Sequence, residues 1–86
     1  MGTKNRPGKF DCYANAEPDE PMFILLGRDP HAPAAVRKWA ADRQAMIEAG
    51  NKPESDRAMT EEARECADAM ERFCAERKWR RENHYP

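Results

Sequence analysis

The residues best suited to recognition chemistry form one short cluster near the C-terminus. Four cations flank an indole there: Arg77, Lys78, Trp79, Arg80 and Arg81. Such cations can hold phosphate groups while the ring stacks on a base. A structural role also explains the cluster, because cations are favoured at the C-terminal end of a helix and Glu76 can pair with Arg80. Both interpretations stay open, and the structural role is the one we favour.

Arg43 is a second candidate, since it interrupts an otherwise apolar stripe that contains Trp39. Its guanidinium must extend to the edge of the helix or find an anionic partner there. We favour the structural explanation over a ligand contact. Arg43 and Arg77 should not meet in one protomer, although they could meet across an oligomer interface. The full set of candidate ligand-binding residues is Arg28, Trp39, Arg43, Arg77, Lys78, Trp79, Arg80 and Arg81.

Signatures of catalysis and of metal binding are missing from the sequence. It has no glycine-rich phosphate loop, no nucleophile beside a plausible base and no H-E-x-x-H motif. His31 and His84 do not have zinc-ligand spacing, and the three cysteines Cys12, Cys66 and Cys74 form no C-x-x-C pair. We therefore expect no catalytic residue, no metal and no cofactor.

The candidate residues depend on a long amphipathic helix predicted over residues 55–79. Its apolar face recurs at helical spacing through Met59, Ala63, Cys66, Ala67, Met70, Phe73 and Cys74, and acidic side chains occupy the other face. Ser55 or Thr60 is expected to cap it. A helix with one apolar face needs a partner surface. Another copy of the chain can supply it, which is the homo-oligomer that we favour, and residues 32–49 and 22–26 can also cover part of this face.

A second helix is predicted over residues 32–49. Gly50 stands where a left-handed helix end belongs, and Pro53 prevents continuation. The short connection to the next helix makes the two helices antiparallel neighbours. The predicted fold class is all-α, an antiparallel helical hairpin.

The chain before the hairpin is harder to assign. The composition of residues 1–18 predicts an irregular arm, which Phe10 and Tyr13 can attach to a surface or which can equally reach a neighbouring protomer. Residues 22–26 are an apolar run that fits a short helix or a buried extended strand, and we favour the helix. The expected division is therefore an arm (1–18), a helical-hairpin domain (19–81) and a frayed tail (82–86).

Composition limits the classes of function. The chain has 86 residues and a net charge of −1, so it lacks the overall positive charge of a general nucleic-acid binder. A nucleic-acid partner is possible but not favoured. No segment has the ~18 apolar residues of a membrane span. An odd number of cysteines without a signal peptide predicts free thiols and a cytoplasmic location, in the host cell if the protein is viral.

Residues 19–40 resemble a segment of small uncharacterised phage and prophage proteins. The shared pattern is D-E-P-x-F-x-L-x-x-x-D-x-x-A-P-x-x-V-x-x-W-A, and it covers about a quarter of the chain. The resemblance brings no known catalytic or binding residue. It implies a small viral protein, a class that includes inhibitors of host defence that act by binding. We expect a homo-oligomer that inhibits a host defence protein or sequesters a small anionic nucleotide signal between protomers. A nucleic-acid-binding module using residues 77–81 and a purely structural protein remain the alternatives.

Overall fold

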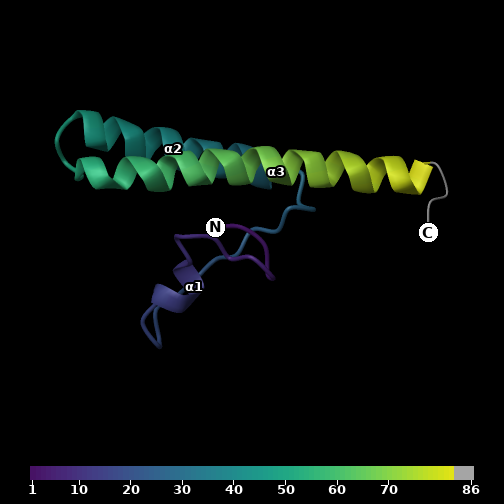
Figure 1. Cartoon of the computed structure of the whole chain (residues 1–86), viewed down its shortest axis with the longest axis horizontal. Helices are drawn as coiled ribbons and strands as arrows, with labels where there is room; N and C mark the ends of the chain where they lie inside the picture. The colour runs from purple at the N-terminus through teal and green to yellow at the C-terminus, as the bar shows by residue number, and fades with distance from the viewer. Residues whose placement is uncertain (83–86) are drawn as a thin grey trace.

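Two long helices lie side by side and antiparallel in the computed structural model, which describes residues 1–82 (Figure 1). The elements in chain order are α1 (Cys12–Asn15), α2 (Ala32–Glu48), the 3-10 helix η1 (Glu54–Asp56) and α3 (Arg57–Glu82). No strand occurs in residues 1–82. The predicted all-α helical hairpin is confirmed. The predicted tail began at residue 82, but Glu82 belongs to α3; the rest of that prediction, residues 83–86 with His84 and Tyr85, lies outside the described residues.

α2 ends as the sequence predicts. Gly50 has a φ of +81°, and its N–H donates to the Ile47 carbonyl oxygen at 3.0 Å. The Asn51 N–H donates to the Met46 carbonyl oxygen at 2.9 Å. This pair of bonds satisfies carbonyl groups that the last turn of a helix leaves unpaired, and it reverses the chain toward α3.

α3 begins differently from the prediction. Its first helical residue follows η1, so Ser55 lies inside a 3-10 turn. Thr60 is fully buried within α3, and its hydroxyl donates to the Arg57 carbonyl oxygen at 2.8 Å. Thr60 is therefore not the helix cap, because its hydroxyl bonds back to the preceding turn rather than to a free N–H. α3 also extends three residues beyond the predicted end at residue 79.

The core between α2 and α3 is a seam of small side chains. Its fully buried apolar members are Ala32, Ala40, Ala63 and Ala67, joined by Ile47 at the turn end. Small residues allow two helix backbones to approach closely. The Arg37 guanidinium crosses the edge of the seam to Asp68, at 2.7 Å, and to Glu71. The hairpin is thus held by a narrow apolar line flanked by ion pairs.

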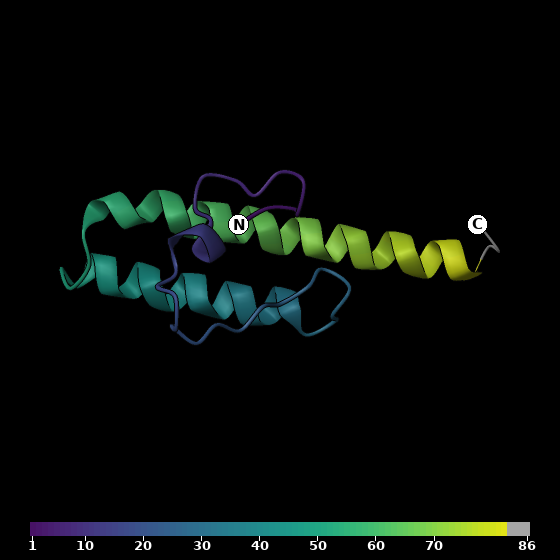
Figure 2. The same cartoon turned by 90° about the horizontal axis from the view of Figure 1, so that it is seen from below.

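Residues 1–31 fold back over one face of the hairpin (Figures 1 and 2). The predicted arm is irregular except for α1, where the Asp11 carboxylate accepts a hydrogen bond from the Tyr13 N–H at 3.2 Å. Phe10 is half-buried, whereas Tyr13 is 75% exposed. The expectation that both aromatics attach the arm is therefore wrong for Tyr13, whose ring faces outward from a single helical turn.

The predicted short helix at residues 22–26 is not formed. A turn closed by the Glu20 N–H and the Glu17 carbonyl oxygen precedes the run, and a turn closed by Asp29 and Leu26 follows it. The stretch between the turns is too short for a stable helix without packing on several sides. The alternative of a buried strand is also wrong, because four of its five side chains are exposed: Met22, Phe23, Ile24 and Leu26.

α3 continues past the start of α2 (Figures 1 and 2). The Cys74 thiol donates to the Arg28 carbonyl oxygen at 3.4 Å, which marks where the chain turns into α2. We call residues 75–82, which follow this contact, the overhang. At 1.5 Å per residue it is about 12 Å long. No helix among the described residues is long and apolar enough to cross a membrane.

Candidate interaction surface

The largest group of exposed apolar side chains is the run from Met22 to Leu26. Phe23 is 87% exposed and Ile24 is 65% exposed. Single exposed apolar residues are ordinary on protein surfaces, but a contiguous run of them is characteristic of interaction sites. This run is therefore the first candidate for contact with a partner.

The fold holds the run against the hairpin at its C-terminal end. A Cβ atom placed on Gly27 would lie 3.7 Å from Met70 and from the Phe73 ring, which is ordinary van der Waals contact. Leu25 is half-buried. The run is thus fixed on α3 by its neighbours while most of its own side chains face solvent.

An apolar cavity of about 410 Å³ lies beneath the run, between the arm and the hairpin. The run contributes Phe23 and Leu25, and the arm and the two long helices supply the other walls, among them Met1, Trp39 and Met70. The walls therefore come from four segments, so the shape of the cavity depends on how the arm and the run lie on the helices. It contains no cluster of charges that would orient a polar ligand.

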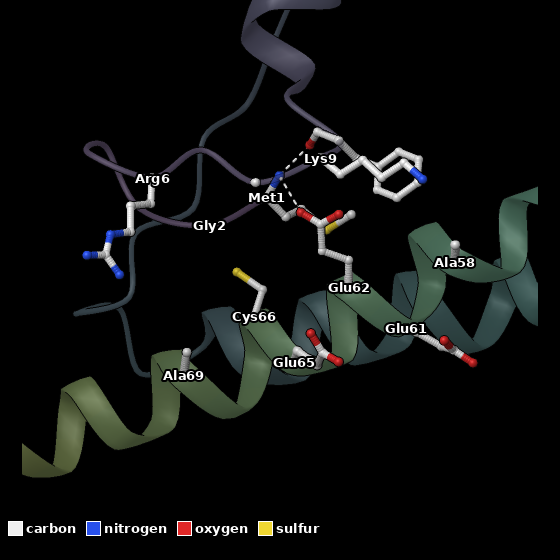
Figure 3. Close-up of a pocket in the computed structure, with 12 residues that line it drawn as sticks. Met1, Gly2, Arg6, Lys9, Ala58, Glu61, Glu62, Glu65, Cys66 and Ala69 are labelled. Atoms are coloured by element: carbon white, nitrogen blue, oxygen red, sulfur yellow. Dashed lines mark hydrogen bonds and ion pairs between the residues drawn. The ribbon is translucent and has the colours of Figure 1, made fainter.

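A second cavity, of about 520 Å³, lies on the α3 side of the arm (Figure 3). There the Met1 ammonium group is 3.3 Å from the Glu62 carboxylate and also donates to the Phe10 carbonyl oxygen. Figure 3 shows Cys66 and Glu65 along the helix below, with the Arg6 side chain directed away from the ion pair. This ion pair attaches the arm to α3.

The structure brings two predicted site residues together, Trp39 and Arg43. The Arg43 guanidinium lies 5.2 Å from the centre of the Trp39 ring and 3.0 Å from the Asp56 carboxylate. Both members of the ion pair are about four-fifths buried. Arg43 therefore connects α2 to η1 through an anionic partner within the chain, rather than extending to the edge of the helix.

The basic cluster, residues 77–81, lies within the overhang. Arg80 pairs with Glu76 at 2.5 Å, as expected from their spacing, and Lys78 lies 3.9 Å from Glu82. Arg77 lies 5.9 Å from the centre of the Phe73 ring. Trp79 is 54% exposed. The cluster is an accessible surface whose charge is partly balanced by two carboxylates.

Arg28 lies apart from Trp39 and Arg43, in the turn that leads to α2. Its side chain is exposed, and within residues 1–82 no ion pair to it is found. Its backbone contact with Cys74 places it next to the base of the overhang. The predicted residues thus separate into two groups. Trp39 and Arg43 form a structural pair on α2, toward the connection to η1, and the basic residues lie at the other end of the hairpin.

Sequence reasoning missed the exposed face of Met22, Phe23, Ile24 and Leu26. The sequence contains a signal that could have revealed this exposure: the run has no partner strand in the sequence, and Pro and Gly bound it on either side. Within residues 1–82 no three His, Cys, Asp or Glu side chains gather as a metal site would require. The three cysteines are free thiols, with Cys12 exposed and the other two half-buried.

Comparison with family models, with curated proteins and with solved structures finds no match for this chain.

Proposed function

We propose that the chain is a small, non-enzymatic binding protein of the phage type that self-associates and acts stoichiometrically as a counter-defence factor. In this proposal it inhibits a host defence protein or sequesters a small anionic nucleotide signal at sites between protomers. It works in the cytoplasm of the host cell. The observation that carries the proposal is the exposed apolar run Met22–Leu26 on the surface of the hairpin.

The exposed run supports binding because folding of one chain leaves it in water. Burying a large apolar side chain contributes roughly 1.5–3 kcal/mol relative to leaving it exposed. Association is the process that can recover this free energy here. The cavity beneath the run is lined mainly by apolar side chains, which suits apolar contact with a partner.

Exposed cations support an anionic ligand between protomers. Arg28 and the overhang lie at the same end of the molecule, where Trp79 offers an exposed ring. Guanidinium groups bind phosphates through paired hydrogen bonds, and rings stack on bases. A ligand on these exposed side chains of a single protomer would stay largely in water. A second copy is therefore needed to enclose it.

Native mass spectrometry combined with light scattering at micromolar concentration tests the self-association. The expected result is a dimer or larger assembly, and a purely monomeric mass would contradict it.

Titration calorimetry with a panel of linear and cyclic nucleotides tests sequestration, with an expected stoichiometry of one ligand per inter-protomer site. Replacing Arg28 and Arg77 with Ala should weaken nucleotide binding at least tenfold. Lys52→Ala, at the opposite end of the hairpin, is the matched control.

Nucleic-acid binding by the overhang is the second candidate, favoured by an exposed Trp79 among four cations. Four phosphate contacts to a duplex predict a slope of about −3.6 for log affinity against log salt. Replacing the four overhang cations with Ala should abolish binding. The matched control removes four cations elsewhere: Lys4, Arg6, Lys9 and Lys52. Equal loss in the two variants, or a flat salt dependence, would exclude this function.

A further inference from the structure

Residues 21–26 form a non-helical stretch whose backbone is open along one edge. The Glu20 N–H donates to the Glu17 carbonyl oxygen at 3.1 Å before the stretch, and the Asp29 N–H donates to the Leu26 carbonyl oxygen at 3.0 Å after it. Among the backbone hydrogen bonds of residues 1–82, none uses an N–H of residues 22–26. In Figure 2 the stretch follows α2, with α1 and the first ten residues on the side toward α3.

Most side chains of this stretch face solvent. Met22, Phe23, Ile24 and Leu26 are exposed, and only Leu25 is half-buried. The stretch is neither helix nor turn, so its backbone groups are not used by regular structure within the described chain. Such a segment can pair as a strand with a second extended segment.

We propose that this stretch pairs with the same stretch of a second copy as a two-stranded antiparallel ladder, with Ile24 at the two-fold axis. The inference deepens the proposed function, since it rests on self-association and names its interface. Unpaired backbone groups beside an exposed apolar row are the template for this kind of strand addition. Two-fold pairing is isologous, so each copy supplies the same surface.

The register follows from the sequence of the segment. With Ile24 opposite itself, Met22 lies opposite Leu26 of the second copy. Glu20 and Arg28 lie in the turns that bound the stretch, and the same register brings the turn with Glu20 near the turn with Arg28 of the second copy. Opposite charges therefore lie near one another at both ends, and apolar side chains meet between them. This self-complementarity favours a second copy over an unrelated strand as the occupant.

The two-fold axis can pass through a hydrogen-bonded pair or through a non-hydrogen-bonded pair, and Pro21 decides which of the two it is. In an antiparallel ladder, opposed residues alternate between hydrogen-bonded and non-hydrogen-bonded pairs. Pro21 has no N–H and must occupy a non-hydrogen-bonded position. Counting from there, Ile24 falls in a hydrogen-bonded pair at the axis, and its N–H points to the second copy. The Phe23 N–H points away from it.

Disulfide cross-linking tests this register in a chain whose three cysteines are replaced with Ser. Hydrogen-bonded pairs place Cα atoms about 5.5 Å apart, within the range of a disulfide. Ile24→Cys should therefore cross-link to itself under mild oxidation. Met22→Cys and Leu26→Cys should each stay largely uncross-linked alone, since two copies of either residue lie about 13 Å apart along the strands. Mixing these two variants should yield the cross-linked dimer.

Proline substitution in the native-cysteine chain gives an independent measurement. Ile24→Pro removes the two axial hydrogen bonds and should raise the dimer dissociation constant about tenfold or more. Phe23→Pro is the matched control and should keep the dissociation constant within about threefold, because its N–H is not used. Equal weakening by both variants, or self-cross-linking of Met22→Cys in place of Ile24→Cys, would overturn the inference.

The outcomes separate this interface from the proposed function. A native assembly that forms without the Ile24→Cys cross-link rejects the strand pairing and leaves self-association standing. A monomeric native mass rejects both. Nucleotide titration of the Ile24→Pro variant then shows whether ligand binding depends on this interface.

Discussion

At the scale of a single residue, the Arg43 side chain connects the two halves of the hairpin. Its guanidinium lies 5.2 Å from the centre of the Trp39 ring and forms a 3.0 Å ion pair with Asp56. The pair is mostly buried, so water screens it less than it screens a surface pair. Arg43 therefore orients η1 and the start of α3 against α2.

Asp56→Asn is expected to lower the free energy of unfolding by about 1 kcal/mol, because it removes the charge from a mostly buried hydrogen-bonded pair. Urea denaturation followed by circular dichroism measures the change. Asp42→Asn is the matched control, since Asp42 pairs with Lys38 on an exposed helix face. Equal losses in the two variants would show that the Asp56 pair contributes no more to the free energy of unfolding than an exposed ion pair does.

Arg37 predicts a dependence of stability on acid pH. Its hydrogen bond holds the pKa of the Glu71 carboxyl below the ordinary value of 4.5. A lowered pKa in the folded state means that the pair stabilises the fold above the ordinary value and that this contribution disappears as the pH falls below it. Melting temperatures between pH 6 and pH 2.5 should therefore fall less steeply in Arg37→Ala than in the wild type.

The control for this prediction is Lys38→Ala, which removes a neighbouring exposed cation from α2. It should keep the wild-type slope of melting temperature against pH. A slope that is unchanged in Arg37→Ala would show that the Glu71 pair does not contribute to the acid dependence.

At the scale of elements, Gly50 decides how α2 ends. Its φ of +81° lies in the left-handed region, and a Cβ atom there would meet nothing within 4 Å. The cost of Gly50→Ala is therefore conformational strain alone, about 1 kcal/mol of unfolding free energy. Gly50→Asn should cost less, because Asn tolerates this region. Chemical denaturation measures both variants, and equal costs would contradict the explanation.

The helices were predictable because local rules and tertiary packing agree there. Gly50 and Pro53 end one helix and start the next, and the predicted 32–49 differs by one residue from α2 (Ala32–Glu48). The start of α3 was less predictable. Ser55 and Thr60 both suit a helix cap, but Ser55 lies in the η1 turn and Thr60 lies in the interior of α3.

The run Met22–Leu26 shows what the sequence could not determine. A five-residue apolar run does not reveal its period, and the pattern alone could not show that the turns at Glu20 and Asp29 would leave it in the open. Of the candidate site residues, those of the 77–81 cluster are neighbours in sequence and lie on one helix, so the sequence alone could place them together. It could not foresee the Arg43–Asp56 pair, which forms across the turn.

At the scale of the whole molecule, the hairpin is elongated. Its principal extents are 50 × 30 × 19 Å and its Cα radius of gyration is 15.0 Å. A compact chain of this length has a radius of gyration of about 12 Å. The extra length comes from a long α3 that no other helix accompanies over the overhang (Figure 1).

Small-angle scattering should therefore give a radius of gyration near 15 Å at limiting dilution. The value should rise with concentration as copies associate. Ile24→Pro should remain near the dilute value over a wider concentration range than the wild type. A constant value near 12 Å would contradict both the shape and the association.

The alanine seam has a thermodynamic consequence. Ala32, Ala40, Ala63 and Ala67 are fully buried, while larger side chains such as Phe23 and Ile24 remain in water. Unfolding a single chain thus exposes little new apolar surface, and its heat capacity should change by less than the usual 12–15 cal/mol/K per residue. A small heat-capacity change flattens the dependence of stability on temperature. If two copies pair as proposed, their association buries the exposed run, and calorimetry should then measure a larger heat-capacity change per residue involved for association than for the folding of either copy.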